Sequence, residues 1–112
     1  MPNYSPTLDE VFHSLSDPTR RTVLEKLTKG PATVTQLAEG FPISLPSFLQ
    51  HLTVLESCNL VRSSKKGRVR TFEIQTKSLK EAELWLSGQR IFWEKRLNQL
   101  DNFLYSQKEK TQ

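Results

Sequence analysis

The stretch that decides the fold is Ile43–Glu56, which reads Ile-Ser-Leu-Pro-Ser-Phe-Leu-Gln-His-Leu-Thr-Val-Leu-Glu. Ser44 is suited to begin a helix, because its hydroxyl can accept a backbone N–H that is free there. A proline two residues later falls in the first turn, where its missing N–H matters least. Phe48, Leu52 and Leu55 follow at spacings of four and three, so they share one face. The stretch predicts a capped helix with an apolar back.

The front of this predicted helix carries no negative charge. Uncharged side chains that donate and accept hydrogen bonds suit the DNA major groove, where Gln can bond adenine twice and Ser can bond several base edges. An apolar side chain there can touch a thymine methyl group. We expect the groove-facing residues to be Ser44, Ser47, Leu49, Gln50 and His51. For this stretch alone, an ordinary surface helix is the alternative.

Three helix signals precede this stretch. Thr7 leads into an apolar stripe formed by Leu8, Val11, Phe12 and Leu15. Asp17-Pro18 supplies a cap and a first-turn proline for a second helix, whose inward face is Val23, Leu24 and Leu27. Thr33 and Gln36 fit a capping box for a short third helix, which would bury Val34, Leu37, Ala38 and Phe41. A short helix, a tight turn and a second capped helix form the helix-turn-helix pattern, although a generic helical hairpin has the same outline.

Two strands follow, at residues 60–64 and 69–74, joined by a tip at residues 65–68. Asn59 can end the preceding helix in the left-handed conformation, and Phe72 and Ile74 are the expected core face of the second strand. The hairpin concentrates positive charge without any acidic residue between positions 62 and 70, in Arg62, Lys65, Lys66, Arg68 and Arg70. Such a hairpin after a helix-turn-helix is typical of a wing that contacts phosphates or the minor groove. Basic edge hairpins also occur simply to prevent aggregation. Arg20 and Arg21 are candidates for further phosphate contacts.

A long helix is predicted from about Leu79 to Gln107, opened by a capping box of Ser78 and Glu81. Its large apolar residues recur at spacings close to a heptad, and a domain of this size cannot cover them alone. We therefore expect a homodimer, which would also set two recognition helices at the spacing of a palindromic site. The expected interface residues are Leu8, Phe12, Leu86, Trp93, Leu97, Leu100 and Leu104. Folding of this helix back onto its own domain is the alternative.

Composition limits the class of protein. The 112 residues suit one small domain, with 36% hydrophobic and 25% charged residues and a net charge of +4. One cysteine, Cys58, no secretion signal and no apolar run of membrane-spanning length favour a cytoplasmic protein. We expect a mobile arm at residues 1–6, a winged helix-turn-helix core at 7–76, a dimerisation helix at 77–107 and a mobile tail at 108–112. The fold class is mostly α with a β-hairpin: four helices, two strands and a fifth helix, dimerising through the first and last helices.

Several motifs together resemble the ArsR-type winged helix-turn-helix transcriptional regulators, in a metal-independent branch. They are Phe12 to Arg21 with its Asp-Pro-Thr-Arg-Arg run, Thr33 to Ala38, Ser44 to Leu55, Leu60-Val61, Gly67-Arg68, and the tail from Trp85 through Asp101. The resemblance covers roughly residues 7–104 and implies a homodimeric repressor that binds double-stranded operator DNA. The chain departs from the family where a serine and a basic residue usually precede His51, since Leu49 and Gln50 stand there.

That departure keeps a second function open, a protein-interaction winged helix with weak or non-specific DNA binding, in which Leu45 and Leu49 form an apolar contact. RNA binding through the wing is a weaker third reading, because no exposed aromatic platform for single strands is apparent. Trp85, Phe92 and Trp93 are either core or the lining of a small-molecule pocket at the dimer interface. The sequence identifies no effector.

Neither a metal site nor an enzyme is expected. A structural zinc site needs about four nitrogen or sulfur ligands, and the chain offers Cys58, His13 and His51. No catalytic Ser/His/Asp set, carboxylate pair or phosphate-binding glycine loop is visible. We expect no cofactor, and we interpret Cys58 as a small buried residue at a helix end.

Overall fold

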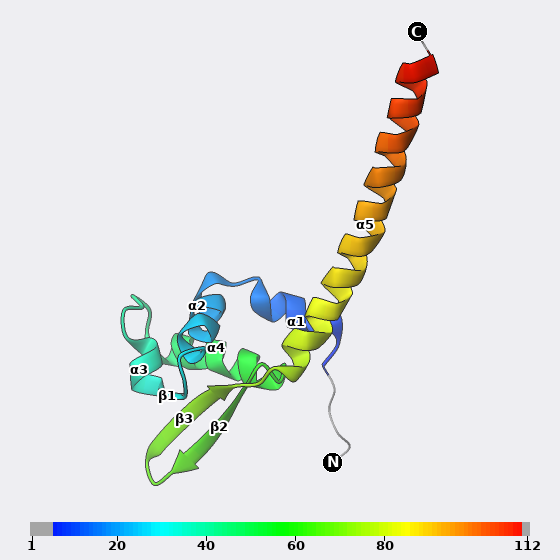
Figure 1. The fold of residues 1–112 in the computed structure, drawn as a ribbon. Coiled ribbons are helices and arrows are strands. Elements are labelled where there is room, and N and C mark those ends of the chain that lie inside the picture. The colour runs from blue at the N-terminus through cyan, green and yellow to red at the C-terminus, as the bar shows by residue number, and fades with distance from the viewer. Residues whose placement is uncertain (1–5, 111–112) are drawn as a thin grey trace. The chain divides into compact units, whose positions relative to one another are not determined.

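The structure, a computed structural model, describes residues 6–110 (Figure 1) and side chains to residue 108. The described residues form two units that divide after Ala82. In chain order the elements are α1 (Leu8–Leu15), α2 (Pro18–Leu27), β1 (Ala32–Thr33), α3 (Val34–Ala38), α4 (Leu45–Ser57), β2 (Val61–Lys66), β3 (Val69–Ile74) and α5 (Lys77–Lys110). The winged helix-turn-helix fold class predicted from the sequence is confirmed.

The helix starts follow the capping residues in the sequence, with one exception. Thr7, Asp17 and Ser44 each accept a backbone N–H at the start of their helix. Thr33 and Gln36 form both arms of the predicted capping box. The prediction that Ser78 caps α5 is wrong. The helix begins at Lys77, two residues before the predicted start at Leu79, and Ser78 is buried inside its first turn.

The first unit has one apolar core, built from α1, α2, α3, α4, the sheet and the start of α5. Phe48, Leu52 and Leu55 are buried, as the spacing in α4 predicts. Leu60 and Phe72 join them from the hairpin side, and Ile74 packs against the same core while partly exposed. The core is completed by Val11, Val23, Leu24, Leu27, Leu37, Cys58, Val61 and Ala82. These positions agree with the sequence patterns, and they fix α4 by its apolar back.

The sheet has three strands rather than the two that the sequence indicates. β1 pairs with β3, with Ala32 opposite Phe72, so the strand order is β1-β3-β2 (Figure 1). A two-residue strand has no period of its own, which is why its pattern could not be recognised. The predicted hairpin is present as β2 and β3, and it turns at Gly67 with φ of 64°.

The end of α4 is closed by the residue that the sequence indicates. Asn59 has a positive φ of 56°. The Leu60 N–H donates to the Leu55 carbonyl at 3.0 Å, and the Asn59 N–H donates to the Glu56 carbonyl at 3.1 Å. This is the Schellman arrangement, with the buried Leu55 and Leu60 side chains as its hydrophobic pair. It turns the chain from α4 directly into the wing.

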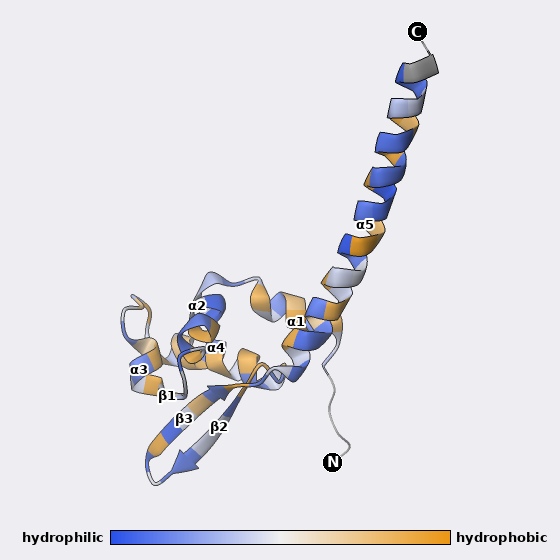
Figure 2. Cartoon of the chain, viewed as in Figure 1, coloured by the Kyte–Doolittle hydropathy of each residue, from blue (hydrophilic) through white to orange (hydrophobic). Residues whose placement is uncertain are grey.

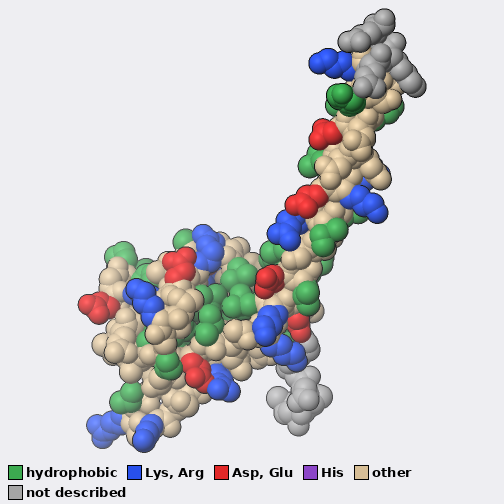
Figure 3. Space-filling model, in the orientation of Figure 1, with side chains coloured by type: hydrophobic (Ala, Val, Ile, Leu, Met, Phe, Trp, Pro, Cys, Tyr) green, Lys and Arg blue, Asp and Glu red, His purple; other side chains and the backbone are tan. Residues whose placement is uncertain are grey.

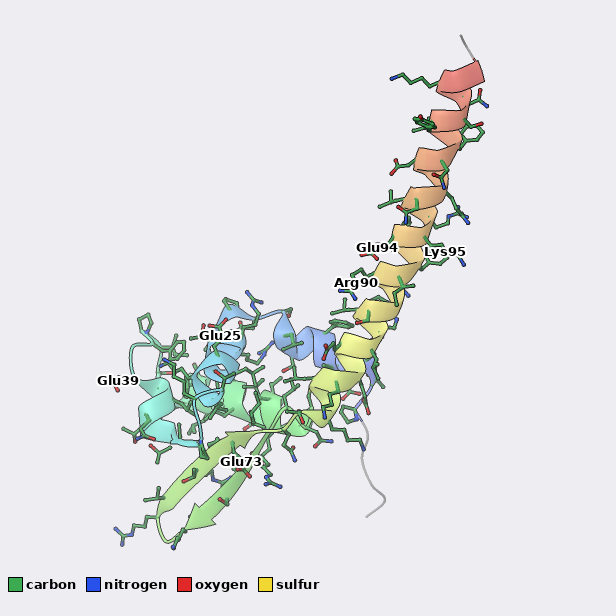
Figure 4. All side chains as sticks on the ribbon, in the orientation of Figure 1. Glu25, Glu39, Glu73, Arg90, Glu94 and Lys95 are labelled. Carbon is green, nitrogen blue, oxygen red and sulfur yellow. The ribbon has the colours of Figure 1, made fainter. Side chains whose placement is uncertain are left out.

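The second unit is the part of α5 that follows Ala82, and it forms a single helix. Figure 2 shows apolar and polar residues alternating along it. Arg90 and Glu94 form an ion pair of 3.8 Å between successive turns (Figure 4). The helix continues through Lys110, past the expected end at Gln107, because Lys and Glu favour helix and no Gly or Pro intervenes.

The expected terminal arms fall largely outside the described residues. Residues 1–5 and 111–112 are not described, so the predicted mobility of the arm and of the last two residues lies outside them. Pro6 is described and buried, and residues 108–110 are helical rather than tail. Each described helix is either too short or too polar to cross a lipid bilayer.

The turn between α3 and α4 is held by one lysine from α2. The Lys26 ammonium donates to the carbonyls of Leu37 at 3.2 Å and Glu39 at 2.8 Å, and it lies 4.7 Å from the centre of the Phe41 ring. Figure 4 shows Glu39 at the end of α3, facing away from the unit. A cation at these carbonyls satisfies acceptors that the helix end leaves free.

We predict that Lys26→Met destabilises the protein by about 1–2 kcal/mol, because it removes two charged hydrogen bonds and a cation–π contact while keeping the aliphatic stem. Urea unfolding followed by circular dichroism measures this. Lys29→Met, at an exposed position of the same segment, is the matched control and should change stability by less than about 0.5 kcal/mol. Equal effects of the two variants would contradict the anchoring role of Lys26.

Candidate nucleic-acid interface

Helix α4 presents a long uncharged face at the surface. Its buried back leaves Ser47, Leu49, Gln50, Thr53 and Ser57 exposed. None of these side chains is acidic, as the sequence analysis expects of a groove-facing helix. The exposed face is therefore able to hydrogen-bond base edges without repelling phosphates.

The hydroxyl groups of the two serines at the start of α4 differ in their hydrogen bonds. Ser44 Oγ accepts the Ser47 N–H at 3.4 Å and donates to Ser47 Oγ at 3.0 Å. The Ser44 hydroxyl is thus used by the helix start, whereas the Ser47 hydroxyl keeps its own proton for an outside acceptor. The Thr53 hydroxyl donates to the Leu49 carbonyl of its own helix at 3.0 Å, so its proton is already used. Ser47 and Gln50 are the polar side chains best placed to read a groove.

Arg20, one of the two expected phosphate contacts outside the wing, lies inside the fold. Its side chain is only 8% exposed. Its Nε donates to the Ser14 carbonyl at 2.7 Å, its Nη2 to the His13 carbonyl at 3.2 Å, and its Nη1 lies 3.1 Å from His51 Nδ1. A buried guanidinium needs such partners. We therefore remove Arg20 from the expected DNA-contacting set.

Arg21 and His51 differ from Arg20 in exposure. Arg21 is exposed and donates to the Leu15 carbonyl at 2.8 Å, so it can keep other donors for a phosphate. His51 is partly buried, and it lies on the flank of α4 that meets the start of α2 rather than on the exposed centre. The two arginines together bond the last three carbonyls of α1, which sequence reasoning did not foresee.

The basic hairpin does not act as a uniform set of cations. Direct pairing places Arg62 opposite Glu73, and the two side chains form an ion pair. Arg70 Nη1 donates to Ser63 Oγ at 3.2 Å, and that hydroxyl lies 3.1 Å from both carboxylate oxygens of Glu56 on α4. The wing is thereby connected to the recognition helix through Arg70, Ser63 and Glu56.

Three cations of the wing remain available to an outside anion. The side chains of Lys65, Lys66 and Arg68 form no hydrogen bond or ion pair with the residues that the structure describes. Figure 3 shows the positive side chains that gather at the hairpin tip. A hollow of ≈ 280 Å³ next to this tip is lined by Thr33, Val34, Thr35, Arg68, Val69 and Arg70. The cations of this hollow come from the wing, and the start of α3 contributes uncharged side chains to it.

The apolar residues of α5 are not core within the second unit. Trp93, Leu97 and the rest of the predicted interface stripe are each about half exposed. Phe92 and Trp93 contact edge to face, with ring centres 5.7 Å apart. Leu8 and Phe12, expected in the same interface, pack partly against the core of the first unit. The view that Trp85, Phe92 and Trp93 are ordinary core of this chain is wrong, since all three are exposed.

Cys58 is buried at the end of α4, as predicted, and its thiol contacts the Glu10 carbonyl at 3.5 Å. Within residues 6–110 there is no group of three or more His, Cys, Asp and Glu side chains that could hold a metal ion.

Comparison with known proteins places this geometry in a family. Residues 15–64 match the family model described as a helix-turn-helix domain. The transcriptional repressor SdpR of Bacillus subtilis is 34% identical over 79 residues, which cover 70% of this chain and 88% of SdpR. The crystal structure of an ArsR family transcriptional regulator is 45% identical, covers 84% of this chain and 97% of that protein, and superposes with a TM-score of 0.76. The chain belongs to the ArsR family of winged helix-turn-helix transcriptional regulators.

Two further transcriptional regulators are similar to this chain. An ArsR-like transcriptional regulator from Rhodococcus is 30% identical, covers 86% of this chain and 91% of that one, and has a TM-score of 0.71. The transcriptional regulator Rv2034 of Mycobacterium tuberculosis is 37% identical over 71 residues, which are 63% of this chain and 66% of that protein. The family resemblance predicted from the sequence motifs is confirmed.

The charge of Asp17 links the start of α2 to His51. Burial raises the pKa of this carboxyl, but the hydrogen bond from the Arg20 backbone N–H and the charge of Arg20 outweigh it, so the pKa lies below the ordinary 3.8. The Oδ2 atom accepts the Arg20 N–H at 3.1 Å and lies 3.7 Å from His51 Nδ1. A lowered pKa means that ionised Asp17 stabilises the folded state above pH 4, and that this contribution is lost as the pH falls through the folded value.

We predict that Asp17→Asn keeps the helix cap, because Asn caps as well as Asp, but removes the charge. At pH 7 the variant should be less stable by up to about 1 kcal/mol, and the difference should shrink as the pH is lowered to about 3. Urea unfolding of both proteins at the two pH values measures it. A difference independent of pH would show that the charge of Asp17 contributes nothing.

Proposed function

We propose that this ArsR family protein is a cytoplasmic, homodimeric repressor that binds specific double-stranded DNA. The observation that carries the proposal is the exposed, uncharged face of α4 beside three unpaired wing cations. Ser47, Leu49 and Gln50 would contact bases. Lys65, Lys66, Arg68 and the remaining donors of Arg70 and Arg21 would contact the backbone. Ser44 would act through the helix start, and Arg62, paired with Glu73, would contribute less.

The names of relatives support the regulatory role. SdpR is called a transcriptional repressor, and the Rhodococcus and Mycobacterium relatives are called transcriptional regulators. In a repressor of this kind, a dimer on a dyad-symmetric site would block access to a promoter. The chemistry needed is binding alone, so we propose neither catalysis nor a cofactor.

Selection of genomic fragments on the purified protein tests the proposal. The best fragment and random DNA are then compared at several salt concentrations. A dyad-symmetric site bound about 10³-fold more tightly than random DNA supports a sequence-specific regulator. Equal binding of all DNA, or none at physiological salt, contradicts it.

The exposed leucines of α4 favour a second candidate, a protein-interaction winged helix. Leu45 is 54% exposed and Leu49 is 40% exposed, and large apolar groups at an exposed helix start suit a protein surface. Leu49→Ser separates the two functions. Weaker binding to the selected site supports a thymine contact, whereas stronger DNA binding supports the second candidate.

For the first function, we predict that Gln50→Ala and Lys66→Ala have different effects. Gln50→Ala should weaken the selected site by about 1–3 kcal/mol and leave random DNA unchanged. Lys66→Ala should weaken both and lower the slope of log affinity against log salt by about one per protomer in contact. Fluorescence anisotropy at four salt concentrations measures both.

Lys80→Ala, which removes the same charge from the exposed start of α5, is the control and should have little effect on DNA binding. Matching losses in all three variants would contradict this division.

The proposed dimer uses the apolar stripe of α5, where half-exposed residues of one helix need a second helix to cover them. We predict that Leu97→Glu raises the dimer dissociation constant by at least about 100-fold, because a carboxylate would enter an apolar interface. Sedimentation equilibrium measures this. Ile91→Glu is the control, because Ile91 is 60% exposed and lies on another face of the same helix. An unchanged dimer in Leu97→Glu, or a monomer in wild type, would exclude this interface.

A further inference from the structure

The Arg20 guanidinium joins three helices beside the flank of the recognition helix that carries His51. It bonds two carbonyls at the end of α1 through Nε and Nη2, and it reaches His51 on α4 through Nη1. Arg20 itself lies in the first turn of α2. This is a buried, fully oriented cation whose third contact is a side chain on the proposed DNA-binding helix.

The chemistry of this contact determines where the His51 ring holds its proton. A guanidinium has only donors, so the Nδ1 atom 3.1 Å from Arg20 Nη1 must be the acceptor. An imidazole that accepts at Nδ1 is neutral and holds its single proton at Nε2. His51 is therefore a one-sided group, with an acceptor facing Arg20 and an N–H donor on the other edge of the ring.

An imidazolium bound to Asp17 fits the distances less well. Asp17 Oδ2 lies 3.7 Å from His51 Nδ1, beyond hydrogen-bond length, and it already accepts the Arg20 backbone N–H. A proton on Nδ1 would also face the donor of Arg20. Asp17 thus balances the charge of Arg20, and it leaves the Nδ1 lone pair to the guanidinium.

The outward donor of His51 has a neighbour on the same side of α4. Ser47 precedes it by four residues, one turn of helix, and the Ser47 hydroxyl keeps a proton for an outside acceptor. The side chain of His51 is 24% exposed, so its ring can reach solvent. The carboxylate beside the ring, Asp17, lies on the Nδ1 edge and accepts the Arg20 backbone N–H, so the Nε2 edge is left for an outside anion.

We propose that His51 donates its Nε2–H to a DNA phosphate, and that Arg20 is the positioning residue that sets this tautomer. The proposal rests on the proposed DNA-binding function and adds a specific backbone contact to it. Because the His51 ring is neutral, this contact releases no counterion, so it adds affinity without adding to the salt dependence.

Two substitutions of His51 test the roles of its two ring nitrogens separately, because each keeps a polar group at one position and removes it from the other. His51→Asn keeps an acceptor at the Nδ1 position for Arg20 but has nothing at Nε2. His51→Gln reaches the Nε2 position with an amide donor but has no acceptor for Arg20. We expect His51→Asn to leave the urea midpoint nearly unchanged and to weaken selected and random DNA alike by at least about tenfold, with an unchanged salt slope. We expect His51→Gln to lower the urea midpoint yet bind DNA more tightly than His51→Asn.

The decisive result is that His51→Asn is the more stable variant while His51→Gln binds DNA more tightly. A purely structural His51 would make affinity follow stability, and that result would overturn the proposal. Unchanged DNA binding in His51→Asn would overturn the phosphate contact. A salt slope lowered by about one would also overturn it, because it would indicate an imidazolium.

Nitrogen-15 NMR of the ring in the free protein at about pH 8 tests the role of Arg20 without DNA. We expect the Nε2-protonated pattern in wild type, and a loss of that preference in Arg20→Lys, whose ammonium cannot bond three acceptors in one plane. An Nδ1-protonated ring in wild type would overturn the proposal. If wild type binds no specific DNA, the proposed function fails and the phosphate contact fails with it, while the tautomer measurement still decides the role of Arg20.

Discussion

The first unit depends on one constraint: a guanidinium placed in its interior must have every side of it hydrogen-bonded. Arg20 meets this requirement with the His13 and Ser14 carbonyls near the end of α1 and with His51 of α4. Neither partner group is available unless α1, α2 and α4 lie in this one arrangement. The Asp17 carboxylate, held at the start of α2 by the Arg20 N–H, supplies the compensating charge. Packing of Val23, Leu24 and Phe48 makes the unit compact, whereas the arginine selects the angle at which α4 is presented.

Two smaller polar connections complete the placement of α4. Lys26 holds the turn before it by bonding the end of α3, and the Schellman turn at Asn59 sends the chain into the wing after it. Glu56 then connects α4 to β2 through Ser63, which Arg70 also bonds. Polar contacts thus hold the recognition helix at three places: the turn before it, the flank that carries His51, and its last turn. A helix held in this way can present a fixed face to a groove, which is what sequence-specific readout by direct contacts requires.

Fewer of the basic side chains of the wing are available to a partner than its composition indicates. Five basic side chains stand within nine residues, but antiparallel pairing puts one of them opposite Glu73, and Arg70 is shared with the α4 connection. Lys65, Lys66 and Arg68 near the tip are left for an outside anion. A charge run therefore sets the sign of a surface, while the register of the strands decides which charges act on a partner.

Much of the fold was predictable from local chemistry. Caps, glycine and asparagine turns and apolar spacing depend on neighbours within a few residues, so the sequence by itself determined α1 to α4, the hairpin, the exposed face of α4 and the family. The start of α5 was misplaced because Ser78 has the chemistry of a cap, and only packing shows that it is buried. The strand β1 was missed because two residues carry no period and pair only with a distant strand. Arg20 was expected at the surface, because the sequence does not show that α1 ends beside it or that His51, 31 residues later, faces it. Contacts between residues far apart in the chain follow from how the helices pack, so only the tertiary structure decided which cations are available to DNA and which hold the fold together.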